Sequence, residues 1–454
     1  MYVKAEYVIV RRCFRVILIM AKKQIIIVGG GFSGLKLAQT LEKIAVPRDD
    51  IEVTLVSRDN FLLFTPFLTE TLAGMLDEGD VVSPLRAFLK KTRFIMGEVT
   101  AIDVKEKTVT YRRPLNDETE TLQADHLILS LGSTSSFFGQ TEIEKLAFTL
   151  KSLDDASLLR NHLMAALEQA NEETDTTARQ ALLTVAVVGA GYTGVEAAGA
   201  IRDLMKDAAR AYSQIRPDEI RVVLIDMAEK ILPTIDASLA KYALRQLKKR
   251  GIEIRLGQKI ESANENAITL SKGEIIPTRS LLWSAGVMPS PLTQMLDCRK
   301  DRRGAILVEP TMAIKEIPGV WAMGDCASIP NLLEEGRPYK GTAQNAEREA
   351  KKLARNILAV LRGQEPQPFL FRSLGEFIVL GDHVAVAQIK WLRFSGFLAW
   401  FLWRTVYLVK IPHWSRKARV VSGWTLDLLF GRSSVETETP RLLRGHVLDR
   451  STKS

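Results

Sequence analysis

Short apolar runs that break at a glycine recur along the chain, and helical patterns follow them. Ile25 to Val28 form the first run, Gly29 follows it, and a helical pattern begins at Leu35. The segment "LLTVAVVGAGYTGVEAAGAI" repeats this arrangement later in the chain. Apolar runs of about four to eight residues between turn signals are typical of buried strands. The pattern therefore predicts an α/β fold with two parallel-sheet domains.

Three further apolar runs indicate where these domains end. "LILSLGS" (127–133) follows the first unit and "LLWSAGV" (281–287) follows the second, and "GVWAMGDCA" carries Gly324 and Asp325 after a short strand. We expect the polar run 171–180 to be a loop before the second glycine strand. The predicted division of the chain is a first domain at 20–150 and 285–388, an inserted second domain at 151–284, a C-terminal region at 389–434 and a disordered tail at 435–454.

The stretch "FSGFLAWFLWRTVYLVKIPHW" (394–414) is too apolar for water and too interrupted for a membrane span. Only ten uncharged residues separate Arg393 from Arg404, whereas a span needs about 20 apolar residues. Basic residues alternate with aromatic ones, and aromatic rings favour the membrane interface. We expect an amphipathic helical region that lies in one leaflet, with Arg404 reaching outward to lipid phosphates. A buried interface of a homodimer is the alternative.

The positive charge is local. The chain has a formal net charge of +9, and between Lys390 and Arg419 there are seven Lys or Arg and no Asp or Glu. This patch does not make a nucleic-acid-binding domain. The three cysteines, Cys13, Cys298 and Cys326, lie far apart, which argues against a disulfide framework, a metal site or a redox dithiol. For residues 1–19 we favour translation from an upstream start over a membrane anchor.

Both glycine segments fit the GxGxxG pattern of dinucleotide binding. In this pattern the first glycine makes a tight turn, the second lets the backbone approach a pyrophosphate, and the third lets helix pack on strand. Plain strand-to-helix packing is the alternative for a single motif, but two copies in the same context predict two Rossmann-like dinucleotide-binding domains. The six glycines are Gly29, Gly31 and Gly34, and Gly189, Gly191 and Gly194.

The next strand of each unit should end in an acid that binds ribose hydroxyls. In the second unit this is Asp226, and no Arg or Lys follows directly to receive a 2'-phosphate, which favours NADH over NADPH. The alternative for Asp226 is a turn residue at a strand end. The first unit has Ser57 instead of an acid, so Ser57 or Asp59 is the candidate ribose contact there.

Together these segments resemble the two-dinucleotide-binding-domain flavoproteins, and more closely the type II NADH:quinone oxidoreductases. The resemblance covers Gln24 to Phe430, and it is carried by the two glycine motifs, "GDCA", "GTAQNAEREAKKLARNI" and "SGFLAWFLWRTVYLVKIP". It implies that the first unit binds FAD and the second NADH. It also implies that Asp325 contacts the phosphate and ribityl chain of the flavin.

The resemblance further implies residues near the reacting rings. Glu196 matches the family glutamate beside the nicotinamide, and a helix-stabilising acid is its alternative role. The family pattern AQxAxQ opens a helix beneath the flavin and forms a wall of the quinone pocket. Gln344 matches it as an amide donor to a quinone carbonyl, but Arg348 replaces the second glutamine. Arg348 is either a charged donor or a salt-bridge residue. The loop 61–68 either reaches the flavin or packs as core.

The activity implied by the resemblance is transfer of a hydride from NADH to the flavin and of two electrons onward to a membrane quinone, without proton pumping. The cofactor carries this chemistry and the protein positions it. The expected location is the cytoplasmic face of the cell membrane, with the lipid bilayer and the quinone as partners. Two alternatives are a ferredoxin-reductase-like flavoprotein and a membrane-associated FAD- and NADH-binding sensor without turnover.

Overall fold

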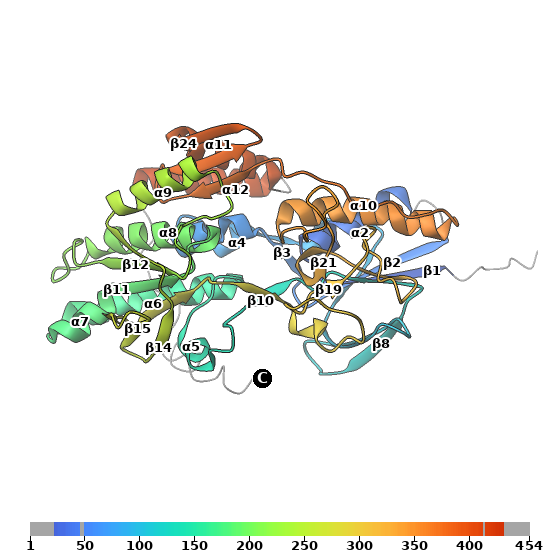
Figure 1. Cartoon of the computed structure of the whole chain (residues 1–454), viewed down its shortest axis with the longest axis horizontal. Coiled ribbons are helices and arrows are strands. Elements are labelled where there is room, and N and C mark those ends of the chain that lie inside the picture. The colour runs from blue at the N-terminus through green and yellow to red at the C-terminus, as the bar shows by residue number, and fades with distance from the viewer. Residues whose placement is uncertain (1–21, 46–49, 412–413, 431–454) are drawn as a thin grey trace, which may run out of the picture.

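The computed structural model describes residues 22–45, 50–411 and 414–430. The predicted tail at 435–454 and the question of residues 1–19 lie outside this part. Two parallel sheets organise the chain, and Figure 1 shows them side by side, one in each half of the molecule. This confirms the predicted α/β class with two Rossmann-like domains.

The first sheet has the strand order β20-β9-β1-β2-β5. Its strands are β1 (Lys23–Val28), β2 (Ile51–Ser57), β5 (Arg93–Met96), β9 (His126–Leu129) and β20 (Val320–Ala322). All of its pairs are parallel, with Ile27 of β1 opposite Leu55 of β2 and Ile128 of β9. β20 comes from far along the chain, so this domain is discontinuous.

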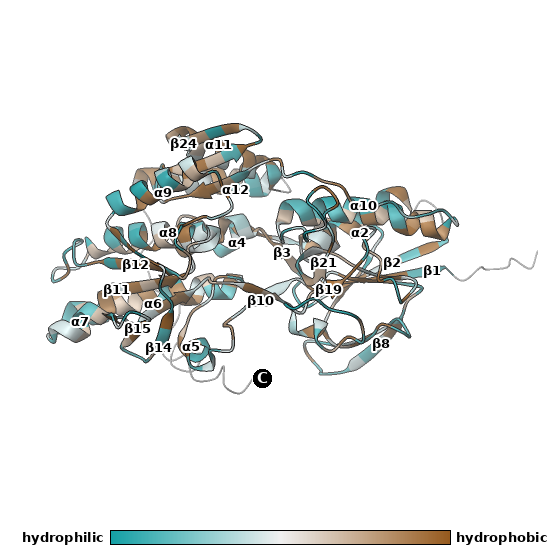
Figure 2. Cartoon of the chain, viewed as in Figure 1, coloured by the Kyte–Doolittle hydropathy of each residue, from teal (hydrophilic) through white to brown (hydrophobic). Residues whose placement is uncertain are grey.

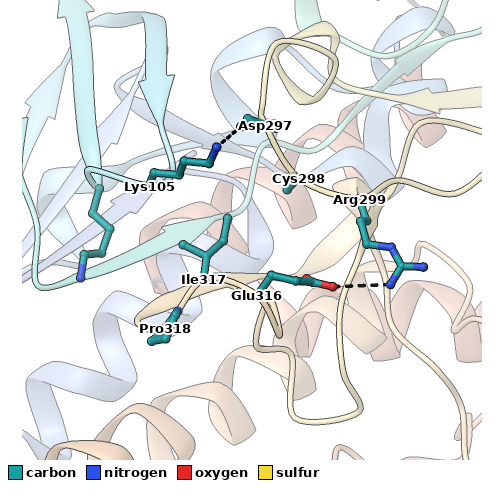
Figure 3. A pocket seen from close by; sticks show the side chains of 8 residues that line it. Lys105, Asp297, Cys298, Arg299, Glu316, Ile317 and Pro318 are labelled. Carbon is teal, nitrogen blue, oxygen red and sulfur yellow. Dashed lines mark hydrogen bonds and ion pairs between the residues drawn. The ribbon is translucent and has the colours of Figure 1, made fainter.

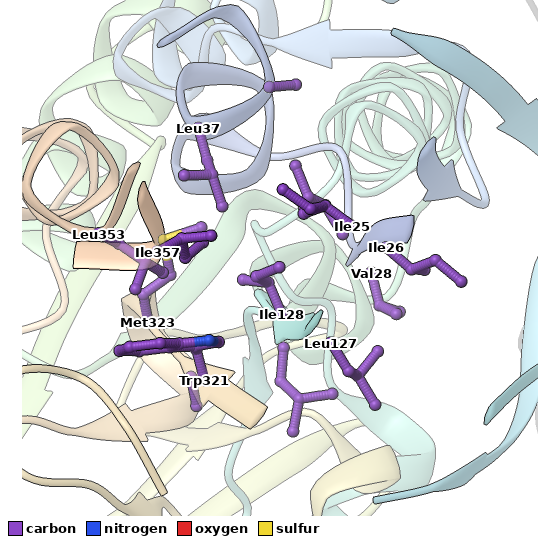
Figure 4. Packing of buried hydrophobic residues seen from close by; sticks show 14 of the residues in the cluster. Ile25, Ile26, Val28, Leu37, Leu127, Ile128, Trp321, Met323, Leu353 and Ile357 are labelled. Atoms are coloured by element: carbon purple, nitrogen blue, oxygen red, sulfur yellow. The ribbon is translucent and has the colours of Figure 1, made fainter. Parts of the chain in front are cut away.

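Two helices, α2 (Phe32–Ile44) and α10 (Ala343–Leu361), pack together against the first sheet. Figure 4 shows Leu37 of α2 and Leu353 of α10 meeting the apolar side chains of the strands, with the Trp321 indole beside them. The buried residues of β1 are almost wholly apolar on both faces because helices and loops cover both sides. This core holds the carboxyl end of β1, where the first glycine loop begins.

The second sheet has the order β13-β12-β11-β17 and is also parallel throughout. Its strands are β11 (Thr184–Val188), β12 (Arg221–Asp226), β13 (Ile252–Leu256) and β17 (Ser280–Trp283). Its helices are α6 (Leu153–Glu172), α7 (Thr176–Leu183), α8 (Tyr192–Ala209) and α9 (Ala237–Lys249). The expected loop at 171–180 is wrong, because α6 runs to Glu172 and the Asp175 side chain then caps α7 by accepting from the amide of Ala178.

Two antiparallel strands connect the halves: β10 (Ser133–Ser135) and β18 (Val287–Pro289). The chain therefore passes from the first domain to the second near residues 133–135, before the predicted border at 150. The reason is that Phe148 pairs with Leu282 in the second sheet and Ile143 joins its core. The return crossing is β18.

Smaller elements surround the two sheets. The strands are β3 (Phe61–Leu63), β4 (Val82–Pro84), β6 (Glu98–Asp103), β7 (Thr108–Arg112), β8 (Thr119–Gln123), β14 (Ile260–Ala263), β15 (Ala267–Leu270), β16 (Ile275–Pro277), β19 (Ile306–Leu307) and β21 (Ala327–Ser328). The short helices are η1 (Thr65–Phe67), α3 (Leu68–Leu72), α4 (Glu78–Val81), η2 (Leu85–Ala87), α5 (Thr141–Leu146), η3 (Pro291–Thr293) and η4 (Gly324–Cys326).

The C-terminal module consists of an antiparallel sheet followed by two helices. Its elements are β22 (Glu376–Val379), β23 (Ala385–Ile389), β24 (Leu392–Gly396), α11 (Phe397–Lys410) and α12 (Trp414–Phe430). The sheet crosses the predicted border between 388 and 389, so the module begins near Glu376. Figure 1 shows it capping the second half above α8 and α9. In the part of the chain that the structure describes, no helix is long and apolar enough to cross a membrane.

Candidate functional site

The first glycine loop has the geometry that a pyrophosphate cradle needs. Gly29 has φ +105°, a left-handed conformation that favours glycine. A Cβ on Gly34 would lie 1.9 Å from the carbonyl oxygen of Gly29, so helix α2 approaches the turn closely only because no side chain intervenes. A Cβ on Gly31 would meet no described atom within 4 Å, which leaves its backbone open to a ligand.

The second loop repeats this geometry closely. Gly189 has φ +103°, and a Cβ on Gly194 would lie 1.8 Å from the carbonyl oxygen of Gly189. Around Gly191 the described residues again leave the space open to 4 Å. Both loops therefore have a tight turn at the first glycine, open space at the second and close helix packing at the third, and the binding of a pyrophosphate there stays a prediction.

A serine supports each loop from the neighbouring strand, and neither serine was among the predicted site residues. The Ser130 hydroxyl donates to the carbonyl of Val28 at 2.8 Å, and the Ser284 hydroxyl donates to the carbonyl of Val188 at 2.7 Å. Both serines stand one residue after a strand, in "LILSLGS" and "LLWSAGV". Because the two serines occupy equivalent positions in the two units, comparison of the two segments could have revealed them from the sequence.

The helix ends behind the loops are free to hold an anion. Within the described residues, no side chain caps the N-terminus of α2 or of α8, and neither first turn contains an acid. Exposed N-terminal amides together with the helix dipole attract phosphate. The open cradle at Gly31 and these uncapped amides fit the pyrophosphate of a dinucleotide such as FAD, and the second loop fits NADH in the same way.

Asp226 and Ser57 end the second strands of the two units. The Asp226 carboxylate accepts from the amides of Ala190 and Ala228, at 2.5 and 2.7 Å. It therefore braces its own glycine loop at the place where a ribose is expected. Ser57 lies beside the first loop, since a Cβ on Gly30 would approach its hydroxyl to 2.6 Å. Both residues lie at the expected edges.

Asp325 faces a small polar cluster beside the first loop. The Ser133 hydroxyl donates to its carboxylate at 2.7 Å, and the Lys151 ammonium donates to the Ser133 hydroxyl at 3.2 Å. Burial lowers the pKa of Lys151, and the Asp325 carboxylate opposes that shift. A Cβ on Gly341 would lie 2.6 Å from Asp325, so the chain before α10 also approaches it. Neither Ser133 nor Lys151 had been predicted as a site residue.

Glu349 is a further residue that was not among the predicted site residues. It lies on the buried face of α10, where its carboxyl accepts from the amide of Gly324 at 2.8 Å. Burial raises the pKa of Glu349 to about 7, and the nearby Asp325 carboxylate adds to the effect. Its position in the charged segment 347–352 indicates a solvated residue, so only the packing of α10 on η4 reveals it.

Glu196 lies at the contact between α8 and the C-terminal module. Its carboxyl accepts from the amide of Val379 at 3.0 Å. Burial raises the pKa of Glu196 to about 8, the hydrogen bond from Val379 opposes this, and the charge of Glu70 adds to it. The carboxyl therefore holds β22 against α8. This contact is compatible with both predicted roles, a position beside the nicotinamide and stabilisation of the helix.

Gln344 and Arg348 lie one turn apart on α10. The Gln344 side chain accepts from the amide of Leu374 at 2.8 Å and donates to the carbonyl of Gly375 at 3.4 Å, which ties α10 to the segment before β22. The Arg348 guanidinium lies over the Phe371 ring, 4.7 Å from its centroid. It borders a hollow of about 400 Å³ that basic residues of α10 share with residues 368–371.

The loop 61–68 packs in the core, and the C-terminal helices cover it. Phe64 and Phe67 are buried in one cluster with Trp403 and Trp424. The Phe67 ring centroid lies 5.6 Å from that of Trp403 and 5.7 Å from that of Trp424. Of the two readings offered for this loop, the structure shows the packing; reach toward a flavin stays a prediction.

The expectation for Arg404 is wrong. Its guanidinium does not reach outward but lies between the rings of Trp400 and Trp424, at 4.1 and 4.4 Å from their centroids. It also pairs with Glu70 of α3 at 3.9 Å, with both side chains largely buried. Burying the guanidinium between two indole faces and beside a carboxylate compensates for its lost hydration.

The outer face of the module remains apolar. Phe397, Leu398, Phe401 and Val409 of α11 are more than half exposed, at 54% to 68%. Leu426, Leu428 and Leu429 of α12 are also exposed. Figure 2 colours stretches of the ribbon of this module brown, for hydrophobic residues. An exposed apolar face of this kind marks a contact surface.

A hollow of about 750 Å³ lies elsewhere, between the β6–β7 turn and the segments at 297–299 and 316–318 (Figure 3). Lys105 pairs with Asp297 there, and Arg299 pairs with Glu316, so these charges are satisfied internally. The half-buried Cys298 borders this hollow. Cys326 is buried, and burial raises the pKa of its thiol to about 12. Among the described residues no group of side chains could hold a metal ion.

Two family models match the chain. The one described as pyridine nucleotide-disulphide oxidoreductase matches residues 23–350, and the one described as NDH2 C-terminal domain matches residues 374–433. The fold and the duplicated glycine loops thus define a pyridine nucleotide-dependent oxidoreductase. Type II NADH:quinone oxidoreductase NdhA of Mycobacterium tuberculosis is 34% identical over 425 residues, which are 90% of this chain and 87% of that protein. The chain belongs to the type II NADH:quinone oxidoreductases.

Other relatives agree with this assignment. A probable NADH dehydrogenase of Dictyostelium discoideum is 30% identical over 421 residues, 91% of each chain. The solved structure of NDH2 from Plasmodium falciparum in complex with NADH superimposes with a TM-score of 0.83. It is 20% identical and the match covers 91% of this chain and all of that one, so it supports the fold. The family model described as NDH2 C-terminal domain covers the C-terminal module, for which the ferredoxin-reductase alternative gives no purpose.

Proposed function

We propose that the protein oxidises NADH and passes two electrons through bound FAD to a membrane quinone, without pumping protons. The observation that carries the proposal is the presence, in one chain, of two dinucleotide cradles and an NDH2-type C-terminal module with an exposed apolar face. A sensor without turnover shares the cradles but needs no route to a quinone.

Each of the two cradles binds a different nucleotide. Gly29, Gly31 and Gly34 hold the FAD pyrophosphate on the N-terminus of α2, with Ser57 and Asp325 toward the ribose and ribityl parts. Gly189, Gly191, Gly194 and Asp226 hold NADH on α8 in the same manner. When bound, FAD supplies the two-electron chemistry between hydride donor and quinone.

The chain's own groups position the reactants. Thr342 caps α10 by accepting from the amide of Asn345 at 3.2 Å, which supports the predicted helix start beneath the flavin. Glu196 holds a proton near neutral pH because of its raised pKa, which suits a group at which a proton is taken up or released. We assign Gln344 and Arg348 to the quinone side of α10.

The direct test is steady-state NADH oxidation by purified protein with a short-chain quinone, together with the visible spectrum. We expect a flavin spectrum, quinone-dependent turnover and a strong preference for NADH over NADPH. Flavin binding without quinone-dependent turnover would instead favour the sensor.

A second test distinguishes the roles of Gln344 and Arg348. Gln344→Ala should raise the KM for quinone and leave NADH-dependent ferricyanide reduction nearly intact. Arg348→Ala tests whether its charge reaches the quinone or serves only the stack on Phe371. Equal quinone kinetics for Arg348→Ala and wild type would remove Arg348 from the quinone site.

We also propose that the apolar face of α11 and α12 rests in the cytoplasmic leaflet. A combined Phe397→Ser, Phe401→Ser and Val409→Ser variant changes only exposed side chains, so it should fold yet lose binding to anionic liposomes. Leu115→Ser, on the fully exposed turn between β7 and β8, is the matched control. If the variant instead changes a dimer to a monomer and still binds liposomes, the face is a homodimer interface.

A further inference from the structure

A basic face of α10 borders the hollow of about 400 Å³ whose other wall is formed by residues 368–371. Four cations, three and four positions apart along the helix, form this face: Arg348, Lys351, Lys352 and Arg355. Three of the four are exposed, and Lys352 is half-buried. Side chains at this spacing are neighbours on a helix, and like charges there destabilise it. The face therefore has an electrostatic cost for the folded protein.

The protein itself supplies no counter-charge in the hollow. Within the described residues none of the four cations forms an ion pair, and no carboxylate lines the hollow. The nearby acid Glu349 faces the amide of Gly324 instead. Burial lowers the pKa of Lys352, and the charge of Arg355 adds to the effect. An anion in the hollow would relieve this repulsion.

The opposite wall of the hollow is apolar, and its open surface is aliphatic rather than aromatic. Phe369 is buried, and the Arg348 guanidinium covers one face of the Phe371 ring. Leu370, in contrast, is 54% exposed. The base of a nucleotide would need a free aromatic face or polar partners, whereas an acyl chain needs only aliphatic contact. The hollow therefore fits a phosphate with an aliphatic part better than a nucleotide.

The hollow lies next to the segment that enters the C-terminal module. Residues 368–371 continue through Leu374, which is 44% exposed, into β22. The Gln344 side chain holds this segment to α10 through Leu374 and Gly375. Figure 1 shows α10 on the same edge of the molecule as the module. A bilayer that contacts the module is therefore within reach of the hollow.

We propose that this hollow binds the phosphate headgroup of an anionic phospholipid, with the cations of α10 on the phosphate and Leu370 against the start of the acyl chains. The inference rests on the proposed contact of the module with the membrane, and it adds a headgroup site outside α11 and α12. Arg and Lys side chains bind phosphate oxygens through charge-assisted hydrogen bonds. Preference for charged lipid then comes from α10, and the apolar contact comes from the module.

The test measures binding of the full-length, FAD-loaded protein to phosphatidylcholine vesicles with and without phosphatidylglycerol. The triple variant Lys351→Gln/Lys352→Gln/Arg355→Gln removes three cations. Arg348 is left in place because it is assigned to the quinone side. The variant should lower the partition coefficient onto vesicles that contain phosphatidylglycerol by on the order of 100-fold. Its binding to pure phosphatidylcholine should match that of wild type.

The matched control, Lys259→Gln/Lys272→Gln/Arg302→Gln, removes the same number of charges elsewhere. All three residues are exposed, and Figure 1 shows β14 and β15, which adjoin Lys259 and Lys272, at the edge opposite the module. Exposed charges farther from the bilayer than a Debye length are largely screened, so this control should bind both kinds of vesicle like wild type. An equal loss in the control would show that net charge sets binding and would overturn the proposal.

Flavin spectra and NADH-dependent ferricyanide reduction at the wild-type level show that the variants are folded. If the triple variant does not fold, Lys351→Gln and Arg355→Gln, both at exposed positions, should each lower binding to the charged vesicles by about fivefold. Lys351→Arg/Lys352→Arg keeps the charge and should bind like wild type. Wild-type binding by the folded triple variant, or by both single variants, contradicts the headgroup site.

Two further outcomes identify the source of the phosphate and separate this inference from the proposed function. If inorganic phosphate at constant ionic strength raises the Tm of wild type but not of the triple variant, while both bind vesicles equally, the hollow takes a soluble phosphate and not a lipid. Wild-type protein that binds neither kind of vesicle would refute the proposed membrane contact. Wild-type protein that binds both kinds equally well would refute the headgroup site alone.

Discussion

The two glycine loops are nearly the same device built twice, and comparing them shows what the backbone decides and what side chains decide. Their first glycines have φ +105° and +103°, and a Cβ on their third glycines would lie 1.9 and 1.8 Å from the carbonyl oxygen of the first. A serine hydroxyl secures each preceding strand from the neighbouring one. The two loops therefore share their backbone geometry and a supporting serine, whichever side chains surround them.

The differences lie in two side-chain positions. Ser57 ends the second strand of the first unit, where Asp226 ends that of the second. Two residues after the third glycine, α2 has Lys36 and α8 has Glu196. Only the second unit thus carries acids at these positions, and only its helix contacts β22 of the C-terminal module through that residue. The two units share the geometry of the glycine loop, and they differ in the ionisable side chains around it.

The largest expected effect comes from the third glycines. In Gly34→Ala the new methyl group would overlap the Gly29 carbonyl, and in Gly194→Ala the Gly189 carbonyl. Such overpacking typically costs about 1–3 kcal/mol or more. Gly34→Ala should lose FAD during purification, whereas Gly194→Ala should keep the flavin spectrum and lose reduction by NADH.

Gly191→Ala is the control for that pair, because its methyl group meets no described atom within 4 Å. It should keep wild-type thermal stability and raise the KM for NADH. If Gly194→Ala lost FAD and Gly34→Ala kept it, the assignment of the two cradles would be reversed.

The next effect separates Asp226 from Ser57. Asp226→Asn keeps one acceptor for the loop amides but loses the charge that binds ribose hydroxyls, so kcat/KM for NADH should fall by about 10- to 100-fold. Ser57→Ala should change flavin content and turnover less than about twofold, a change below about 0.5 kcal/mol. The measurement is kcat/KM for NADH and NADPH in both variants. An unchanged NADH value in Asp226→Asn contradicts the ribose contact.

A smaller, pH-dependent effect on stability is expected from Glu196. Burial raises the pKa of Glu196 from 4.5 to about 8, so the folded state keeps a proton that the unfolded state loses. This contribution to stability is present below pH 4.5 and is lost as pH rises through 8. The free energy of unfolding of Glu196→Gln should therefore rise relative to that of wild type between pH 5 and 9, by an amount on the order of a few kcal/mol at most, and Tm measured across this range checks it.

Lys36→Gln is the matched control at the equivalent helix position. Burial lowers the pKa of Lys36, with Lys351 adding to the effect, so its linkage to stability has the opposite sign to that of Glu196. The Tm of Lys36→Gln should therefore not rise relative to wild type from pH 5 to 8. A parallel drift in both variants would show that Glu196 is not the source.

The smallest expected effect is that of removing the thiols. Neither cradle uses a cysteine: Cys326 is buried with its sulfur accepting from the amide of Leu131, and Cys298 borders a separate hollow. Replacing Cys13, Cys298 and Cys326 with Ser should leave NADH:quinone turnover within about twofold, or roughly 0.4 kcal/mol. Loss of flavin reduction by NADH in a folded, FAD-loaded triple variant would point to a thiol role.

The sequence by itself determined the two cradles, because each is made by residues within one strand-turn-helix segment whose glycine spacing leaves few conformations. It also determined that the C-terminal region is apolar at its surface without a long span. These are local properties. Even the replacement of an acid by Ser57 could be read from its position at a strand end.

Only the tertiary structure decided where the charges of the C-terminal helices lie. Glu70 and Trp424 are 354 positions apart, and Glu196 and Val379 are 183 apart, so no periodicity brings them together. Arg404 was expected to face lipid because its neighbours on the helix are apolar, but a buried carboxylate on α3 offers it a better partner than water. The crossing at 133–135 likewise follows from the pairing of Phe148 with Leu282. Long-range packing decides such contacts, since the cost of burying a charge depends on every group around it.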